Sequence, residues 1–168
     1  MTRQQFIEQI TAEQESLRRF LRGLCRGDGF LADDIAQEAL LKAYLSFGSF
    51  EGRSRFSTWL FRIAYNCWHD HLKKDNRFET FDDEAVAEEV GLIPENKRRD
   101  DHEHLYLLEA ISRLTPQEKT VILLFYMKEM SIKEIESITD MPSGTIRSCL
   151  SRGRVHLRKY LLKDNLRF

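Results

Sequence analysis

The last third of the chain carries arginines at a spacing that suits DNA. Ile146, Leu150 and Leu157 recur at intervals of four and seven, which places them on one face of a helix. The opposite face holds polar and basic residues: Arg147, Ser148, Ser151, Arg152 and Arg154. Arginine can bind guanine through two hydrogen bonds, and cations that face phosphates add affinity without sequence preference. The pattern predicts a helix that reads duplex DNA.

A second helical signal comes just before this one. The stretch Ile132–Ile138 has an isoleucine at every third position, and Ser131 with Glu134 forms a capping box that starts the helix. Met141-Pro142 then marks a tight turn. A short supporting helix, a turn and a basic amphipathic helix make a helix-turn-helix, whose second helix enters the DNA major groove.

Helical periodicity extends over the rest of the chain, with no alternating strand pattern. We expect an all-α fold of two small domains. The first, 1–77, holds three helices, and the second, 102–168, holds the helix-turn-helix and two helices before it. Thr115-Pro116-Gln117-Glu118 starts one of these with a cap and a proline at the first helical position. The expected helices of the first domain cover 4–25, 31–47 and 56–74.

An acidic segment, 78–101, separates the two domains. From 79 to 101, nine acidic residues stand against three basic ones, and the helical period fades. Such a segment predicts a flexible linker. The final stretch, 146–168, instead holds seven basic residues and one acid. The formal net charge of -1 therefore hides a basic end, and the local field governs DNA binding.

Composition excludes several classes of protein. A hydrophobic content of 42% allows a packed core, and no apolar run approaches the ~18 residues of a membrane span. Three cysteines without paired spacing indicate buried free thiols in a reducing cytoplasm. Four histidines raise the alternative of a metal-dependent helical enzyme: His69, His71, His102 and His104. His-x-His on a helix points the rings about 200° apart, a poor chelate, so we expect neither metal nor cofactor.

Two runs in the first domain complete the pattern. One reads Asp-Asp-Ile-Ala-Gln-Glu-Ala-Leu-Leu-Lys-Ala-Tyr at 33–44. The other reads Phe-Ser-Thr-Trp-Leu-Phe-Arg-Ile-Ala-Tyr-Asn at 56–66, after Ser-Phe-Glu-Gly-Arg at 49–53. They resemble domain two of the extracytoplasmic-function (ECF) group of bacterial sigma factors. The runs at 114–118 and 142–148 resemble domain four of the same family, in the same order.

The resemblance implies a transcription initiation factor with no catalytic site and no small-molecule substrate. Such a protein binds core RNA polymerase through the beta-prime clamp helices and the beta flap, directs it to promoters and helps to melt them. An anti-sigma factor is a further implied partner. The family's docking surface on the clamp helices corresponds here to Asp33, Asp34, Gln37 and Glu38.

The resemblance also assigns DNA contacts. Cationic, amide and aromatic side chains suit a melted strand with exposed bases. The minus-10 region of the family corresponds to Phe50, Arg53, Arg55, Arg62, Asn66, Lys73 and Lys74. Its minus-35 region corresponds to Ser143, Thr145, Arg147, Ser148, Ser151, Arg152 and Arg154. Phe50 has an alternative role in closing the hydrophobic core, and Trp59 is expected in that core.

Two departures and one rival function accompany the resemblance. Glu136 stands where the family usually has a small residue, and Asp140 where glycine is usual, so the angle within the helix-turn-helix stays open. The acidic linker is expected to thread into the polymerase cleft. The main alternative is a free-standing helix-turn-helix transcriptional regulator, which would bind a specific duplex alone and leave 33–66 without a role.

Overall fold

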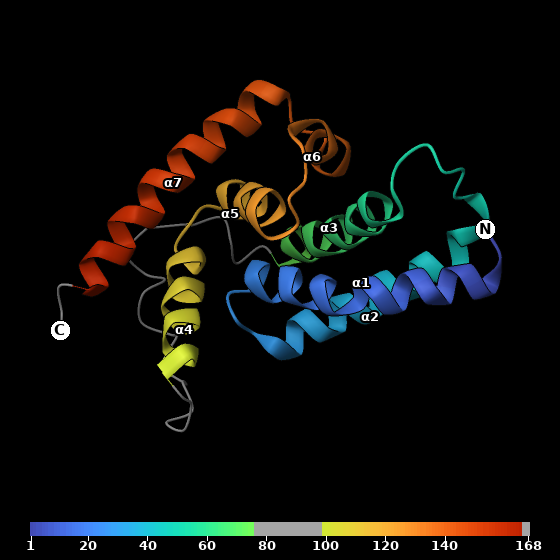
Figure 1. Ribbon diagram of the computed structural model, residues 1–168, viewed down its shortest axis with the longest axis horizontal. Helices are drawn as coiled ribbons and strands as arrows, with labels where there is room; N and C mark the ends of the chain where they lie inside the picture. Colours follow the sequence, from blue (N-terminus) through green and yellow to red (C-terminus); the bar gives the residue numbers. More distant parts are fainter. Residues whose placement is uncertain (76–98, 166–168) are drawn as a thin grey trace.

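Helices make up the regular structure of this chain. The structure, a computed structural model, describes residues 1–75 and 99–165, and no strand occurs in those two stretches. The all-α prediction is confirmed. Most of the predicted acidic linker lies outside the described residues. The elements, labelled in Figure 1, are α1 (Arg3–Leu24), α2 (Gly29–Ser46), η1 (Phe47–Ser49), α3 (Phe56–Lys74), α4 (Arg99–Ser112), α5 (Pro116–Ile122), η4 (Leu123–Met127), α6 (Ile132–Thr139) and α7 (Ser143–Asn165).

Predicted helix boundaries are close to those observed. The third helix has the predicted bounds, and α4 begins at Arg99, inside the segment predicted as linker. α2 begins two residues earlier than predicted, because Asp28 caps it: Asp28 Oδ1 accepts a hydrogen bond from Leu31 N at 3.1 Å. Gly29 therefore lies inside the helix. The residue with left-handed backbone that separates α1 from α2 is Gly27, with a φ of 79°.

The first three helices form one unit around a seam of small residues. Four alanines of α2, spaced by four, three and four, are buried: Ala32, Ala36, Ala39 and Ala43. Because these side chains are short, α2 packs closely on both α1 and α3. Larger side chains fill the centre, where the rings of Phe20 and Phe61 lie 5.2 Å apart between centroids.

The second unit contains α4 to α7. Both predicted capping boxes are present, Thr115–Glu118 at α5 and Ser131–Glu134 at α6. α7 lies close to α5 because Gly153 has no side chain: a β-carbon there would lie 2.9 Å from Ile122 Cγ1. Asp140 occupies the left-handed position that ends α6, with a φ of 58°. Aspartate tolerates this conformation better than most residues, so the turn of the helix-turn-helix forms without glycine.

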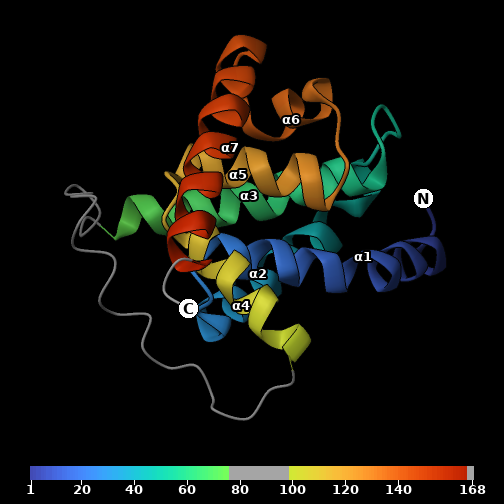
Figure 2. The same cartoon turned by 60° about the vertical axis from the view of Figure 1, so that its left-hand side comes forward.

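The two units pack against each other. η4 and α5 lie against α1, and α6 lies against α3, as Figures 1 and 2 show from two sides. Lys128 Nζ lies 2.6 Å from Glu13 Oε2 and 5.0 Å from the centroid of the Phe61 ring. Gly23 of α1 meets Leu123 so closely that a β-carbon there would lie 2.8 Å from Leu123 Cδ1. The sequence predicted two domains and did not predict this contact, which joins both units in one core.

A lysine is buried near the contact between the units. Lys119 of α5 is only 2% exposed. Burial, with the nearby charge of Arg26 at the end of α1, lowers the pKa of Lys119 to about 8. Burial also raises the pKa of the Cys25 thiol to about 12. A charged lysine here destabilises the folded chain at neutral pH.

We expect Lys119→Met to raise the free energy of unfolding at pH 7 by about 2 to 3 kcal/mol. Methionine fills similar space without a charge. In the unfolded chain Lys119 keeps its proton up to a pKa near 10.5, whereas in the folded chain it loses the proton near pH 8. As pH rises from 8 to 10.5, the folded chain loses this proton and the destabilising effect of Lys119 fades. The free energy of unfolding of the wild type therefore rises toward that of the variant, and the advantage of the variant shrinks.

Chemical denaturation of both proteins from pH 7 to 10 measures this difference. Cys25 destabilises the folded chain above pH 9 in both proteins. Because burial is the largest influence on its pKa and the charge of Lys119 a smaller one, most of this effect is common to the two proteins. A variant advantage that stayed constant over this range would contradict the assignment of a buried charge to Lys119.

Candidate nucleic-acid interface

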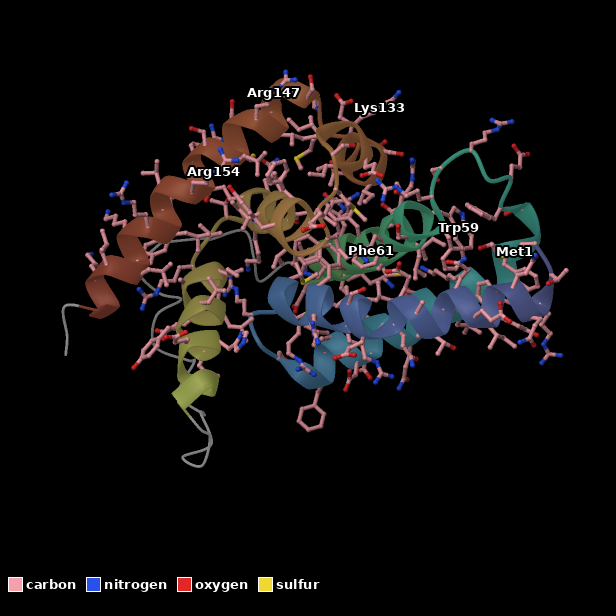
Figure 3. All side chains as sticks on the ribbon, in the orientation of Figure 1. Met1, Trp59, Phe61, Lys133, Arg147 and Arg154 are labelled. Carbon is pink, nitrogen blue, oxygen red and sulfur yellow. The ribbon has the colours of Figure 1, made fainter. Side chains whose placement is uncertain are left out.

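The predicted DNA contacts of α7 lie in its N-terminal half. Ser143 and Thr145, in the first turn, are half-buried. The other five are exposed: Arg147, Ser148, Ser151, Arg152 and Arg154. Figure 3 shows Arg147 near the outer end of α7, with Lys133 of α6 beside it on the same rim of the molecule. Lys133 is exposed, and the sequence did not predict it as a contact.

Arg154 is held by two aromatic side chains of η4. Its Nε donates a hydrogen bond to the hydroxyl of Tyr126. Its guanidinium lies 5.5 Å from the centroid of the Tyr126 ring and 5.8 Å from that of Phe125. Tyr126 is 53% exposed, so the phenol and the cation face solvent together. The sequence did not predict a role for Tyr126, although a tyrosine inside an apolar helical run is the signal that could have found it.

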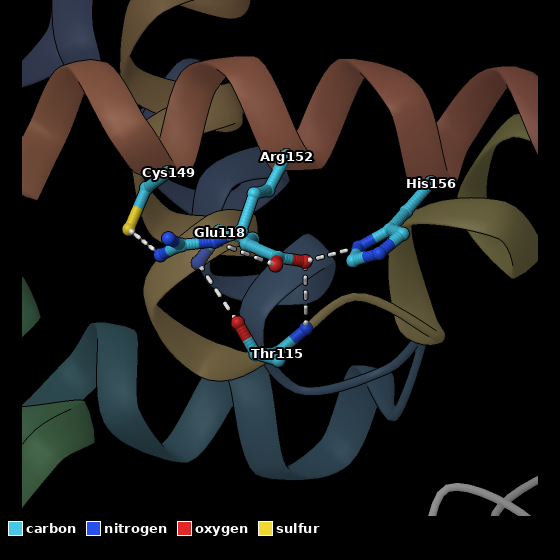
Figure 4. A network of polar contacts seen from close by, with 5 residues as sticks. All are labelled: Thr115, Glu118, Cys149, Arg152 and His156. Carbon is cyan, nitrogen blue, oxygen red and sulfur yellow. Dashed lines mark hydrogen bonds and ion pairs between the residues drawn. The ribbon is translucent and has the colours of Figure 1, made fainter.

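Arg152 points along α7 toward α5 (Figure 4). Its Nε lies 3.8 Å from Glu118 Oε1, and its Nη2 lies 3.6 Å from the sulfur of Cys149. The Glu118 side chain is 4% exposed. Its Oε2 accepts a hydrogen bond from the backbone N of Thr115 at 3.4 Å, and the same oxygen lies 3.1 Å from His156 Nδ1. A buried carboxylate is stable only when it is paired, so Glu118 both caps α5 and orients Arg152.

A second group of predicted contacts lies on the face of α3 that is turned away from α2. Arg62 and Asn66 are exposed one turn apart on this face. Beside them a cavity of about 370 Å³ opens between α3 and α6. It is lined by Ser54, Thr58, Trp59, Arg62, Ile63, Asn66 and Ser137. The hydroxyl of Thr58, one of these residues, is buried and has no hydrogen-bond partner among the described residues.

Two arginines of this second group are paired with α6 and the turn after it. Arg62 Nη1 donates a hydrogen bond to the backbone oxygen of Ser137 at 2.8 Å, and Arg62 Nη2 lies 3.6 Å from Asp140 Oδ2. Arg55 Nη2 lies 2.7 Å from Glu134 Oε1. The helix-turn-helix therefore covers part of the face that the sequence assigns to a melted strand.

The remaining predicted minus-10 residues are more scattered. The Phe50 ring is half-buried, 5.2 Å from the Trp59 ring between centroids, which favours its alternative role in the core. Arg53 is exposed in the loop and pairs with Glu51 at 2.7 Å. Lys73 and Lys74 are exposed at the far end of α3, roughly 16 Å along the helix from Arg62. The structure thus brings Arg62 and Asn66 together at the cavity and places Arg55 and Arg62 against α6 and the turn after it, while the two lysines lie at the far end of α3.

The predicted acidic row lies on α2. Three of its members are exposed: Asp33, Asp34 and Gln37. Glu38 is half-buried and lies 2.9 Å from Lys42 Nζ and 3.1 Å from His71 Nε2. The hydrogen bond from Lys42, aided by His71, lowers the pKa of Glu38. Glu38 is therefore engaged within the chain, and the free part of the row is shorter than predicted.

His71, one of the four histidines that raised the alternative of a metal site, contacts the carboxylate of Glu38. No three His, Cys, Asp or Glu side chains within 1–75 and 99–165 are grouped so that they could hold a metal ion. None of the helices that the structure describes is long and apolar enough to cross a membrane.

Large apolar side chains lie among the acids of α2. Phe30 is 90% exposed and Leu45 is 75% exposed, and Leu41 and Tyr44 are also exposed. At 100° per residue these side chains fall on the same face as Asp33 and the rest of the acidic row. This face, which we call the α2 outer face, lies on the side of the molecule away from α6 and α7 (Figures 1 and 2). Exposed apolar patches mark interaction surfaces.

Known proteins resemble this chain over most of its length. Residues 9–78 match the family model of sigma-70 region 2, and residues 104–157 match that of sigma-70 region 4. The ECF RNA polymerase sigma factor SigW of Bacillus subtilis (strain 168) is 36% identical over 140 residues, which are 77% of this chain and 75% of SigW. The ECF RNA polymerase sigma-E factor of Haemophilus influenzae is 34% identical over 131 residues, 72% of this chain and 69% of that protein.

Solved structures agree with these matches. The sigma factor RpoE of Bartonella quintana, in complex with the anti-sigma factor NepR, superposes with a TM-score of 0.75 at 26% identity, over 95% of this chain and 97% of RpoE. CnrH, in complex with the cytosolic domain of CnrY, shares the fold with a TM-score of 0.70 at 20% identity, over 97% of this chain and 91% of CnrH. With regions 2 and 4 present in order and relatives matched over most of both chains, this protein belongs to the ECF RNA polymerase sigma factors.

Proposed function

We propose that this sigma factor divides its work among three surfaces. The α2 outer face docks on core RNA polymerase, α7 reads the minus-35 element, and the exposed face of α3 holds the melted minus-10 strand. The observation that carries the proposal is the placement of these surfaces. Within one small unit the α2 outer face and the α3 face point in different directions, so the unit can bridge polymerase and DNA. The protein acts in the cytoplasm, where it meets both partners.

At the minus-35 element, α7 lies in the major groove. Arg147, Ser148 and Ser151 face the base edges, where arginine discriminates guanine by about 1–3 kcal/mol. Arg152 and Arg154 start from restrained positions, since Glu118 orients the first and Tyr126 the second. Restraint before binding reduces the side-chain entropy that is lost on contact.

At the minus-10 element, the cavity beside α3 suits a base that has left the stack. The Asn66 amide can donate and accept hydrogen bonds to a base edge. Trp59, half-buried at the cavity wall, provides an aromatic surface. Arg55 and Arg62 supply cations for the phosphates of the same strand.

At the polymerase, the α2 outer face combines carboxylates with exposed leucines. An interface of this kind fits a partner with an apolar centre and a basic rim, and the beta-prime clamp helices are that partner in our proposal. The beta flap takes the second unit. The RpoE of Bartonella quintana is solved with an anti-sigma factor, and we expect a regulator of the same class for this chain.

Run-off transcription with purified core polymerase tests the proposal. On a library of promoter fragments, we expect initiation only when the chain is added, at sites that share two spaced elements. Arg147→Ala should reduce initiation about tenfold, the loss of one bidentate contact, and Lys163→Ala at the far end of α7 should leave it unchanged. Absence of initiation, combined with tight specific duplex binding by the chain alone, would favour the free-standing regulator.

The docking surface has its own test. Leu45→Ser on α2 should weaken the affinity for core polymerase about tenfold, because an apolar contact is lost. Ile7→Ser is the control, since Ile7 is an exposed apolar residue of α1 and lies outside both surfaces that the proposal gives to the polymerase. Competition with a labelled sigma factor for limiting core polymerase measures both. Equal affinities for the two variants would rule out the α2 outer face as the docking site.

A further inference from the structure

Arg154 is a cation that is held in place by uncharged groups. Its Nε donates a hydrogen bond to the Tyr126 hydroxyl, and its guanidinium lies against the rings of Tyr126 and Phe125. Arg152, on the same helix, instead pairs with the carboxylate of Glu118. Within 1–75 and 99–165 no carboxylate forms an ion pair with Arg154, so its charge is available to an outside anion.

The Tyr126–Arg154 pair also has unused hydrogen-bond donors. A guanidinium carries several N–H groups, and a phenol oxygen can accept one hydrogen bond while its own proton is donated elsewhere. Arg154 uses its Nε on the Tyr126 oxygen, which leaves the N–H groups of Nη1 and Nη2 and the hydroxyl proton of Tyr126. In the part of the chain that the structure describes, no acceptor takes these donors.

Both members of the pair reach solvent from a fixed base. Tyr126 is 53% exposed and Arg154 is exposed, whereas the Phe125 ring is half-buried and packs against the core. The rings of Phe125 and Tyr126 meet edge to face, 5.1 Å apart between centroids. Phe125 therefore anchors the pair, and a ligand that bound it would restrict little further side-chain motion.

The backbone under Tyr126 is unusual. η4, Leu123–Met127, is a π-helical turn that follows α5. Such turns are rare, and they frequently occur at functional sites. Because a π turn holds more residues than an α turn, the direction of Tyr126 differs from the one that a regular continuation of α5 would give it.

The pair lies beside the face of α7 that is proposed to read DNA. Arg154 follows Arg147 by seven residues, which at about 100° per residue puts both within about 20° of one direction and roughly 10 Å apart along the helix. Figure 3 shows Arg147 near the outer end of α7 and Arg154 farther along. The major groove is about 12 Å wide. When Arg147 reaches base edges in the groove, Arg154 and Tyr126 therefore lie near a bordering phosphate backbone.

We propose that Tyr126 and Arg154 together bind one DNA phosphate beside the minus-35 element, a site that we call the Tyr–Arg clamp. Arg154 supplies its charge and its Nη donors, and Tyr126 donates its hydroxyl proton to the same phosphate. The inference rests on the proposed reading of the minus-35 element by α7. It adds a contact from η4, an element outside the helix-turn-helix.

A phosphate suits the donors of the Tyr–Arg clamp. Arginine has no acceptor, and the Tyr126 oxygen already accepts from Arg154, so the ligand must offer acceptors alone. A phosphodiester group presents two oxygens that share a negative charge, and hydrogen bonds of this charge-assisted kind are strong. Guanine also offers two neighbouring acceptors, O6 and N7, so the test separates a phosphate contact from a base contact.

The test uses the polymerase holoenzyme and a promoter fragment selected by run-off transcription. Tyr126→Phe removes one hydroxyl and keeps the ring beside Arg154. Tyr160→Phe is the matched control, because Tyr160 is a half-buried tyrosine of α7 with the Arg113 guanidinium 5.5 Å from its ring centroid. At about 100° per residue Tyr160 points about 140° away from Arg147, so it does not face the DNA.

Methylphosphonate interference gives the main readout. Each fragment carries one uncharged methylphosphonate in place of a phosphate of the upstream element, and holoenzyme affinity is measured for every position. We expect one position to weaken wild-type binding about tenfold, Tyr126→Phe binding about threefold, and Arg154→Gln binding less than twofold. Tyr160→Phe should keep the wild-type profile. On the unmodified fragment, Tyr126→Phe should bind about threefold more weakly than wild type.

Two results would overturn the Tyr–Arg clamp. If Tyr126→Phe weakens binding equally at every position, its profile matches that of wild type and the hydroxyl has only a structural role. If instead Tyr126→Phe and Arg154→Gln abolish the effect of a base substitution and leave the phosphate profile unchanged, the pair reads a base.

Arg147→Ala separates the clamp from the proposed function. If Arg147→Ala weakens binding while Tyr126→Phe keeps the wild-type profile, the clamp is wrong and the reading by α7 stands. If neither Arg147→Ala nor any replaced phosphate of the upstream element changes binding, the minus-35 assignment is wrong and the clamp is wrong with it.

Discussion

The alanine seam of α2 is the constraint on which the first unit depends. Short side chains on one side of α2 let α1 and α3 approach it closely, and they leave no room there for anything larger. The large apolar and acidic side chains of α2 must then face outward. One side of α3 packs against this seam, and its other side is left for α6 or, in our proposal, for DNA. The seam thus creates both outward surfaces without itself contacting a partner.

The second unit uses buried polar contacts in a comparable way. Glu118 caps α5 with one hydrogen bond and meets Arg152 and His156 of α7 with its carboxylate oxygens (Figure 4). The same group that starts a supporting helix therefore fixes a side chain of the reading helix. Tyr126 does the equivalent for Arg154 from η4. The reading surface is supported by the helices behind it, so its geometry is inseparable from their packing.

Local signals in the sequence predicted the local structure. Capping boxes, the proline at the start of α5 and the isoleucine spacing of α6 each act within a few residues, and each appears where expected. The family motifs predicted the two domains and the class of function. The contact of Arg62 with Ser137 spans 75 positions in the chain, and periodicity carries no information on such pairs. Periodicity shows which side of a helix is apolar, and it does not show which neighbour meets the polar side.

The same limit explains why the surroundings of individual site residues were not predicted. Glu38 belongs by spacing to the exposed row of α2, but Lys42 and His71 engage it, and His71 comes from another helix. Phe50 looks like a loop aromatic free for stacking, but Phe56 and Trp59 from α3 surround it. Each of these surroundings depends on a contact between elements.

The central claim is that the face of α3 that holds Arg62 and Asn66 binds the melted minus-10 strand in the initiation complex. A cryo-electron microscopy structure of core polymerase with this chain on a promoter tests it most directly. The account predicts that Arg62 has left Ser137 and Asp140 and contacts the minus-10 strand, with α6 displaced from α3. A promoter complex in which α6 still lies on α3, with Arg62 bound to Ser137, would contradict it.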